Sequence, residues 1–353
     1  MIRRSTVKKN KVNIHISGIA MVMLPAILVL MAMLGWGFGL FTGIEEEPYI
    51  NREENLIVVG VSQLGSESGW RTANTESVQK ALTKQNGYFL IFNNARQKQE
   101  NQIKAIRSFI SQRVDYIVLA PVVESGWETV LQEAKEAGIP VIVMDRSVDV
   151  SDQSLYTTHV GSDSVEEGKK AGYWLEEHLA RKGLSNQEIN IVVLKGTEGA
   201  SAQIGRTVGF SMIAGQHDNW NILEQEYGDF TIYKGKEVME NFLQKYDDID
   251  VVISQNDDMT FGAIEAIKES GRTVGVGGDI TIISFDAVHD ALEMVAEGTI
   301  NVDIECNPDQ GKYISDVIQL LESGQEVEKR YYVEEDVYTM QNVTEEVLNE
   351  RIY

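Results

Sequence analysis

The sequence after residue 55 alternates short, uninterrupted apolar runs with amphipathic stretches, and this alternation constrains the fold more than any other feature. Runs rich in valine and isoleucine, such as 56–61 and 141–144, have the length and composition of strands buried on both faces. The stretches between the runs repeat apolar residues at helical spacing. Strands that alternate with helices pair in parallel and carry helices on both faces of the sheet. We therefore predict an α/β fold with parallel sheets.

The alternation forms two series, separated by a less regular region around 154–162. In the first series we predict strands at 56–61, 88–92, 116–120 and 141–144, with helices at 70–84, 98–112 and 126–137. In the second we predict strands at 189–194, 222–227, 251–254, 280–285, 299–305 and 330–337, with helices at 164–181, 201–214, 233–245, 258–269, 288–296 and 309–321. Two similar α/β domains in tandem are expected.

The first 44 residues differ in composition from the rest of the chain. Five basic residues lie within residues 3–11, and residues 12–44 contain no Asp, Glu, Lys or Arg. The apolar run 19–40 is long enough to span a membrane, and the basic side is expected to stay in the cytoplasm. A cleaved signal peptide is the alternative, but the run exceeds the usual apolar core and no small-residue cleavage motif follows it. We expect a single-pass anchor, with the rest of the chain outside the cytoplasm.

Charge and cysteine usage exclude several classes of function. All 54 acidic residues and 26 of the 31 basic residues follow residue 44, which gives that part a net charge of −28 and disfavours nucleic-acid binding. The five histidines and the single cysteine, Cys306, show no metal-ligand spacing, so no metal site and no disulfide framework are expected. The glycines at 196–199 and 275–278 fit neither a phosphate loop nor a dinucleotide fingerprint, so no cofactor is expected.

Polar and aromatic residues follow the carboxyl ends of the predicted strands, where an open parallel sheet forms its ligand site. Arginine, aspartate and asparagine side chains make paired hydrogen bonds to hydroxyl groups, and an aromatic face stacks on the apolar face of a sugar ring. Each residue also has a structural explanation, such as a surface ion pair or a helix cap. Their coincidence at one edge indicates a polyol site that includes Glu67, Trp70, Arg71, Asp145, Arg146, Arg206, Phe230, Asn256 and Asp286.

Several long strings in these regions resemble those of a known family. They are VGVSQLGSESGWR at 59–71, APVVESGWETVLQEAKEAGIPV at 120–141, DRSVDV at 145–150, GTEGASAQIGR at 196–206, GDFTIYKGKEVMENF at 228–242 and QNDDMTFGAIEAIKESG at 255–271. From about residue 55 onward the chain resembles the type I periplasmic sugar-binding proteins of ABC transporters, and within them the galactofuranose-binding branch.

The resemblance implies two Rossmann-like lobes that close around a ligand and are joined by three hinge crossings, near 159–162, 305–307 and 332–334. It implies an N-terminal lobe of 55–160 plus 307–332 and a C-terminal lobe of 161–306 plus 333–353, with 45–54 as a tether to the anchor in 1–44. Glu67 and the Trp70–Arg71 and Asp145–Arg146 pairs would contact the sugar from the first lobe. From the second lobe, Arg206, Asn256 and Asp286 would contact it, and Phe230 would form an aromatic wall. At the second crossing, either Glu305 or Cys306 would face the sugar, and we include Glu305 among the ligand residues.

We therefore expect a non-enzymatic, monomeric receptor domain for a monosaccharide, whose partner is a transport permease or a sensor histidine kinase. The membrane anchor departs from free or lipid-anchored transport binders and would suit a fixed co-receptor. A glycoside hydrolase is the alternative enzyme, with carboxyl groups from Glu67, Asp145 and Asp286. The arginines beside the first two should keep those carboxylates ionised, which argues against a general acid. A sugar-responsive repressor would need an N-terminal helix-turn-helix, which the basic and apolar N-terminal segment does not resemble.

Overall fold

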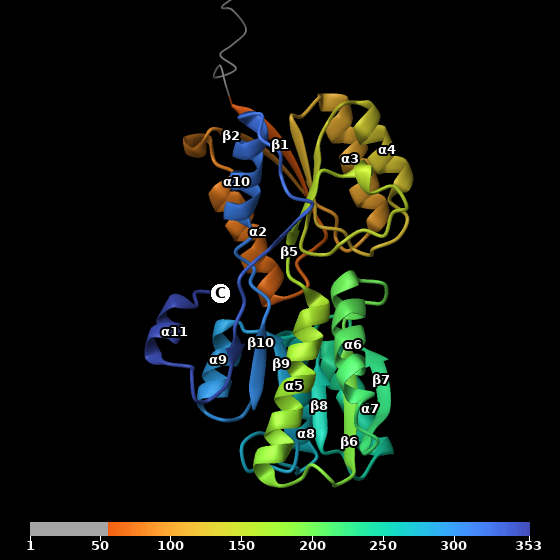
Figure 1. The fold of residues 1–353 in the computed structure, drawn as a ribbon, viewed down its shortest axis with the longest axis vertical. Helices are drawn as coiled ribbons and strands as arrows, with labels where there is room; N and C mark the ends of the chain where they lie inside the picture. Colours follow the sequence, from red (N-terminus) through yellow and green to blue (C-terminus); the bar gives the residue numbers. More distant parts are fainter. Residues whose placement is uncertain (1–55) are drawn as a thin grey trace, which may run out of the picture. The chain divides into compact units, whose positions relative to one another are not determined.

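The computed structural model describes residues 56–353, which form one compact unit containing two six-stranded β-sheets (Figure 1). The first sheet is parallel throughout and has the order β11-β5-β4-β3-β1-β2. Its strands are β1 (Ile57–Gln63), β2 (Tyr88–Asn94), β3 (Tyr116–Leu119), β4 (Val141–Met144), β5 (Thr158–Gly161) and β11 (Arg330–Tyr332).

The second sheet repeats this architecture with the order β12-β10-β9-β8-β6-β7. All of its neighbouring strands are parallel except β10 and β12, which pair antiparallel. Its strands are β6 (Ile189–Lys195), β7 (Trp220–Tyr227), β8 (Val251–Ser254), β9 (Thr281–Asp286), β10 (Val302–Glu305) and β12 (Val337–Tyr338). The predicted α/β fold with two lobes of mainly parallel sheet is confirmed.

Helices cover both faces of each sheet, because successive strand residues are buried against opposite layers. In β3, Ile117 belongs to the core with the helices on one face and Val118 to the core on the other. In the first lobe these layers are α3 (Gln99–Gln112) with α4 (Glu128–Glu136), and α2 (Gly69–Ala81) with α10 (Gly311–Glu322).

The second lobe has the same layered arrangement. One layer contains α5 (Ser164–Lys182) and α6 (Ser201–Ala214), and the other contains α7 (Ile232–Lys245), α8 (Asp257–Glu269) and α9 (His289–Ala296). The short helix α11 (Glu345–Glu350) packs near α9. Two 3₁₀ turns, η1 (Lys84–Asn86) and η2 (Gln153–Leu155), lie in the first lobe.

The chain passes between the two lobes three times (Figure 1). We call these segments the first crossing (162–163, between β5 and α5), the second crossing (306–310, between β10 and α10) and the third crossing (333–336, between β11 and β12). The predicted single strand at 330–337 is wrong, because the third crossing divides it into β11 of the first sheet and β12 of the second.

Two elements were not predicted. Strand β5 lies in the region that looked irregular, because its buried side chains include the polar Thr158 and His159. The His159 ring is held by the carbonyl oxygen of Asp145, 2.8 Å from Nε2. Helix α11 has six residues, which is too short for an apolar period to be visible.

No helix within residues 56–353 is long and apolar enough to cross a membrane. The predicted membrane span at 19–40 lies outside the described residues, as do the basic tail and the predicted tether at 45–54.

Helices α5 and α6 approach each other closely because glycines face the partner helix. A Cβ atom built on Gly209 would lie 2.0 Å from the carbonyl oxygen of Val165, and one on Gly168 would lie 2.3 Å from that of Arg206. Such separations leave no space for a side chain. The contact fixes the position of Arg206 on α6 relative to Glu167 on α5.

The substitution Gly209→Ala should therefore destabilise the protein, since the added methyl group meets backbone atoms that cannot rotate away. We expect a loss of about 1–3 kcal/mol in the free energy of unfolding, measured by chemical denaturation. Gly215→Ala, at the end of the same helix with φ −66° and 3.2 Å of clearance, should change the stability much less. Equal losses in the two variants would contradict the role of close helix packing.

Candidate functional site

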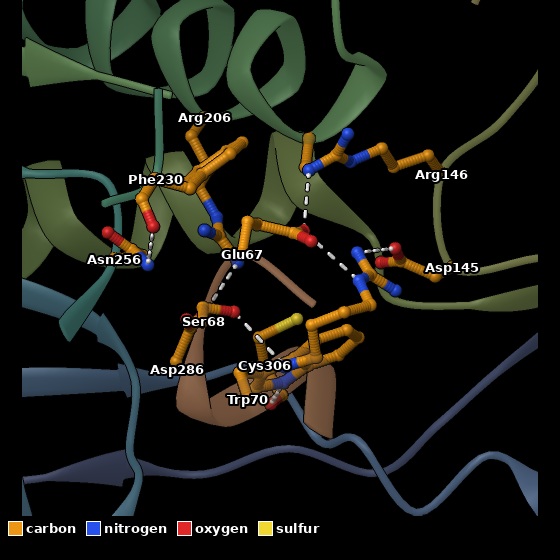
Figure 2. A pocket seen from close by; sticks show the side chains of 12 residues that line it. Glu67, Ser68, Trp70, Asp145, Arg146, Arg206, Phe230, Asn256, Asp286 and Cys306 are labelled. Carbon is orange, nitrogen blue, oxygen red and sulfur yellow. Dashed lines mark hydrogen bonds and ion pairs between the residues drawn. The ribbon is translucent and has the colours of Figure 1, made fainter. Parts of the chain in front are cut away.

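A cavity lies between the two lobes at the carboxyl ends of their strands (Figure 2). It encloses about 300 Å³ of empty space, part of which is open to solvent. Its lining is Glu67, Ser68, Trp70, Arg71, Asp145, Arg146, Ala202, Arg206, Phe230, Asn256, Asp286 and Cys306.

The structure brings nine of the ten predicted site residues to this cavity, and Glu305 is the exception. The Glu305 carboxylate points to the C-terminal segment instead, where it pairs with Arg351 at 2.6 Å and accepts the Asp336 backbone N–H at 2.9 Å. The next residue, Cys306, lines the cavity. Ser68 and Ala202 also line it but were not predicted, because small residues carry little chemical signal in a sequence.

Four charged side chains of the first lobe form a continuous buried network. The Arg71 guanidinium donates to Glu67 at 3.1 Å and to Asp145 at 2.5 Å, and Arg146 lies 3.4 Å from the same Glu67 oxygen (Figure 2). Burial lowers the pKa of Arg71, but the carboxylates of Asp145 and Glu67 outweigh this effect and raise it. Burial lowers the pKa of Arg146, and the Glu67 carboxylate opposes that shift. Each of the two guanidinium groups has a carboxylate partner.

Local backbone geometry places these side chains at the cavity. Ser68 begins α2 as its N-cap, accepting the backbone N–H of Arg71 through its hydroxyl at 3.1 Å. Asp145 directly follows β4 with φ 60°, a left-handed conformation that turns the chain sharply at the strand end. The first turn of α2 and the turn after β4 therefore present their side chains to the same space.

Two aromatic side chains form apolar parts of the wall. The Trp70 indole N–H donates to the carbonyl oxygen of Cys306 at 2.5 Å, so this ring is fixed against the second crossing. The Phe230 ring lies 5.2 Å from the Arg146 guanidinium carbon. It also covers Gly196, where a Cβ atom would lie 1.9 Å from the ring, so glycine is required there.

Arg206 is the central charged group of the second lobe. Its guanidinium donates to Glu167 at 2.7 Å, to Asp286 at 3.3 Å and to the backbone carbonyl of Gln255. Asp286 ends β9 with φ 111°. Burial raises the pKa of Asp286, and the adjacent guanidinium opposes this shift. Arg206 thereby links a cavity carboxyl group to a buried carboxylate of α5.

Asn256 is positioned by its own helix cap. Its side-chain oxygen accepts the backbone N–H of Met259 at 3.0 Å, and its amide nitrogen donates weakly to the carbonyl of Phe230 at 3.4 Å. The cap explanation considered from the sequence is therefore correct, and the residue also lines the cavity.

The two lobes contact each other directly beside the cavity. The Gly69 backbone N–H donates to Asp258 at 3.2 Å, and the Ser147 N–H donates to the Ser201 hydroxyl at 2.7 Å. A further backbone hydrogen bond joins Glu124 and Gly199 at 2.9 Å. These contacts describe a closed arrangement of the lobes around the cavity.

One polar atom of the lining lacks a partner within the described part of the chain. Oε2 of Glu67 is buried and accepts no hydrogen bond there, although Oε1 pairs with both arginines. A buried carboxylate oxygen without a donor is unfavourable. Glu67 therefore keeps one acceptor oxygen without a donor among residues 56–353, while its other oxygen binds both arginines.

Two groups of side chains within residues 56–353 have donor atoms close enough together to hold a metal ion. Glu167, Cys306 and Glu335 have donor atoms within 4.8 Å of one another, and so do the α9 residues His289, Asp290 and Glu293. In the first group, the Arg206 guanidinium already provides a positive charge 2.7 Å from Glu167. The second group is on the surface, away from the cavity lining.

Comparison with known proteins gives consistent matches over most of the chain. A family model for the periplasmic binding protein domain matches residues 59–349. The galactofuranose-binding protein YtfQ of Escherichia coli is 45% identical over 266 residues, which cover 74% of this chain and 81% of the relative. The family resemblance inferred from the sequence motifs is confirmed.

Solved structures agree with this match. A Mycobacterium smegmatis protein in complex with β-D-fucofuranose is 44% identical with a TM-score of 0.77, covering 81% of this chain and 92% of that one. The binding protein component of the arabinose ABC transporter from Shewanella sp. ANA-3, bound to α- and β-L-arabinofuranose, is also 44% identical with a TM-score of 0.77. That match covers 84% of this chain and 95% of the other.

The variant Arg206→Met should lose about 3–5 kcal/mol in the free energy of unfolding, because Glu167 and Asp286 would be buried without their counter-charge. Chemical denaturation at neutral pH measures this loss. Arg107→Met is the matched control, since Arg107 pairs with Glu133 at an exposed site and its removal should change little. Similar results for the two variants would show that the buried network does not depend on Arg206.

Proposed function

Because the chain belongs to the periplasmic binding protein family, we propose that it is a receptor whose lobes close on one uncharged monosaccharide in the furanose form. It is a binding protein rather than an enzyme, as are the relatives described above. The observation that carries the proposal is the cavity lining itself, in which guanidinium, carboxyl, amide and aromatic groups from both lobes converge on one small space.

The charge pattern of the cavity favours an uncharged ligand. Each of its three guanidinium groups, on Arg71, Arg146 and Arg206, has a carboxylate of the protein within 3.4 Å. A phosphate or carboxylate on the ligand would compete with these carboxylates instead of finding a free cation. A hydroxyl group can donate to Glu67 and accept from an arginine at the same time.

The ligands of similar proteins favour a five-membered sugar ring. The E. coli relative is named for galactofuranose, and the two structures described above hold fucofuranose and arabinofuranose. For this chain we propose Glu67, Asp145 and Asp286 as hydroxyl acceptors, Arg146, Arg206 and Asn256 as donors, and Trp70 and Phe230 as apolar walls. Arg71 would orient the two first-lobe carboxylates.

Binding would be coupled to lobe closure through the three crossings. We propose two rigid lobes, 56–161 plus 311–332 and 164–305 plus 337–353, which rotate about the three crossings. Cavity groups come from both lobes, and the hydrogen bonds from Gly69 to Asp258 and from Ser147 to Ser201 require the lobes to be close. A ligand that contacts both lobes stabilises the closed state by the difference between its contacts in the two states.

The membrane arrangement is part of the proposal. Residues 19–40 would anchor the receptor, and residues 45–54 would connect it to the binding domain outside the cytoplasm. A receptor held at the membrane would deliver its sugar, or its closed conformation, to a neighbouring membrane protein. We propose the permease of an ABC transporter, because the arabinose-bound relative is described as a component of such a transporter.

Calorimetric titration of the full chain in detergent with galactofuranose, galactose, ribose, arabinose, xylose and fructose tests the ligand class. We expect one furanose-forming sugar to bind with a dissociation constant of about 1 μM or less, about −8 kcal/mol. Absence of binding across this panel would refute the sugar proposal while leaving the family assignment intact.

In the same titration, Glu67→Gln should weaken binding roughly ten- to a hundredfold, because an amide group cannot accept at both positions and hydrogen bonds to a charged group are worth about 1.5–3 kcal/mol. Glu198→Gln is the matched control, because Glu198 is exposed in the loop after β6. Unchanged affinity of Glu67→Gln would remove Glu67 from the ligand residues.

Deletion of residues 1–44 should release the protein from membranes into the soluble fraction while keeping its sugar affinity within about twofold, a difference of about 0.4 kcal/mol. Cell fractionation and calorimetry of the purified product measure both effects. A full-length chain found in the soluble fraction would contradict the anchor. An insoluble deletion product would show that the N-terminal segment is needed for folding.

A further inference from the structure

The three crossings are joined by one carboxyl group. Oε1 of Glu335, in the third crossing, accepts the backbone N–H of Asn307 in the second crossing at 3.0 Å. The same oxygen accepts the hydroxyl of Ser162 in the first crossing. Glu335 is separated from Ser162 by 173 positions and from Asn307 by 28. A single side-chain oxygen thus holds together the three segments about which the lobes would rotate.

This junction is in direct contact with the wall of the cavity. The Ser162 hydroxyl lies 3.3 Å from the Cys306 sulfur, and Cys306 lines the cavity. Glu167 has a donor atom within 4.8 Å of both Cys306 and Glu335, and its other contact is the 2.7 Å ion pair with the cavity residue Arg206. If Arg206 or Cys306 moves when a ligand binds, the movement would therefore displace Glu335 through one intervening side chain.

The junction contains more acidic groups than its surroundings can neutralise. Glu167 is 1% exposed, and its Oε1 has no hydrogen-bond partner in the described residues. The groups that act electrostatically on Glu335 or on its neighbour Cys306 are Glu167 and Lys170 of α5, Arg206 of α6 and Asp286 of β9. The Arg206 guanidinium already forms ion pairs with Glu167 and Asp286. Lys170 Nζ donates to the backbone carbonyl of Glu335, at 3.1 Å, and not to its carboxyl group.

Protonation of the Glu335 carboxyl group would remove one negative charge from the junction. Burial, followed by the neighbouring Glu167 charge, raises the pKa of Glu335 to about 8. Burial also raises the pKa of the Cys306 thiol, so that side chain is neutral. The protonated carboxyl group keeps its acceptor oxygen for Ser162 and Asn307 and no longer repels Glu167.

We propose that Glu335 is a positioning residue for ligand binding, whose protonated side chain holds the three crossings in the closed arrangement. This inference rests on the proposed receptor function. Hinge rotation would change the geometry of the crossings and expose the junction to water, which would weaken the hydrogen bonds to Ser162 and Asn307 and the repulsion by Glu167. Closure on the sugar would then take up a proton at Glu335.

The sign of the pH dependence follows from the raised pKa. A group whose pKa is higher in the closed state favours closure at low pH, and this contribution is lost as the pH rises from about 4.5 to about 8. Sugar affinity should therefore fall as the pH rises, by at most about tenfold per pH unit for one linked proton.

The test compares Glu335→Gln with wild type in the full chain in detergent, with a chelator present so that metal ions play no part. Glutamine keeps an acceptor oxygen for Ser162 and Asn307 but cannot ionise. With D-galactose and L-arabinose as probes, wild-type affinity should fall by up to about a hundredfold between about pH 6 and pH 9, because one linked proton changes it about tenfold per pH unit until the pH reaches about 8. The affinity of Glu335→Gln should change much less. Glu334→Gln, one residue away and exposed, should behave as wild type.

Equal pH dependence of affinity in Glu335→Gln and wild type would overturn the inference. If no sugar of the six-member panel described above binds, the proposed function fails, and the thermal unfolding midpoint without sugar then tests the junction. The wild-type midpoint should then fall more steeply with rising pH than that of Glu335→Gln. If the midpoints of wild type and Glu335→Gln change in parallel with pH, Glu335 does not carry the proposed proton. Because Asp258 and Asp303 also have raised pKa values, of about 6 and about 7, the difference between variant and wild type is the quantity to measure.

Discussion

Buried guanidinium groups need carboxylates around them, and this requirement shapes both halves of the site. Arg71 has Glu67 and Asp145 as partners within the first lobe. Arg206 has Glu167 and Asp286 as partners within the second lobe. Each lobe can therefore satisfy its own charges as it folds. The cavity is completed when two polar surfaces, each already organised, come together.

This division bears on how a ligand could favour closure. The buried cations of each lobe already have carboxylate partners within that lobe, and the hydrogen bonds that join the lobes beside the cavity are few. A polyol offers donors and acceptors on all sides, so it can satisfy groups on both lobes at once. In the proposed mechanism, closure depends on a small set of contacts, and the crossings would be sensitive to single side chains such as Glu335.

Much of the site followed from one property of parallel sheets, which is that the carboxyl ends of all strands meet at one edge. Asp145 after β4, Asn256 after β8 and Asp286 at the end of β9 were found in this way, although they are far apart in the sequence. The choice between Glu305 and Cys306 could not be made by the same reasoning. Adjacent residues at a strand end point in opposite directions, and the C-terminal Arg351 binds the glutamate on the side away from the cavity.

The amino-acid sequence alone determined the alternation of strands and helices, the edge of each sheet that carries the site, and the family. These depend on local periodicity and on motifs that are continuous in the chain. The tertiary structure decided how 330–337 is shared between two sheets, which oxygen of Glu67 lacks a partner, and that Ser162, Asn307 and Glu335 meet. Those features arise from contacts between segments up to 173 positions apart in the chain. Local sequence patterns do not show which of these distant segments will contact each other.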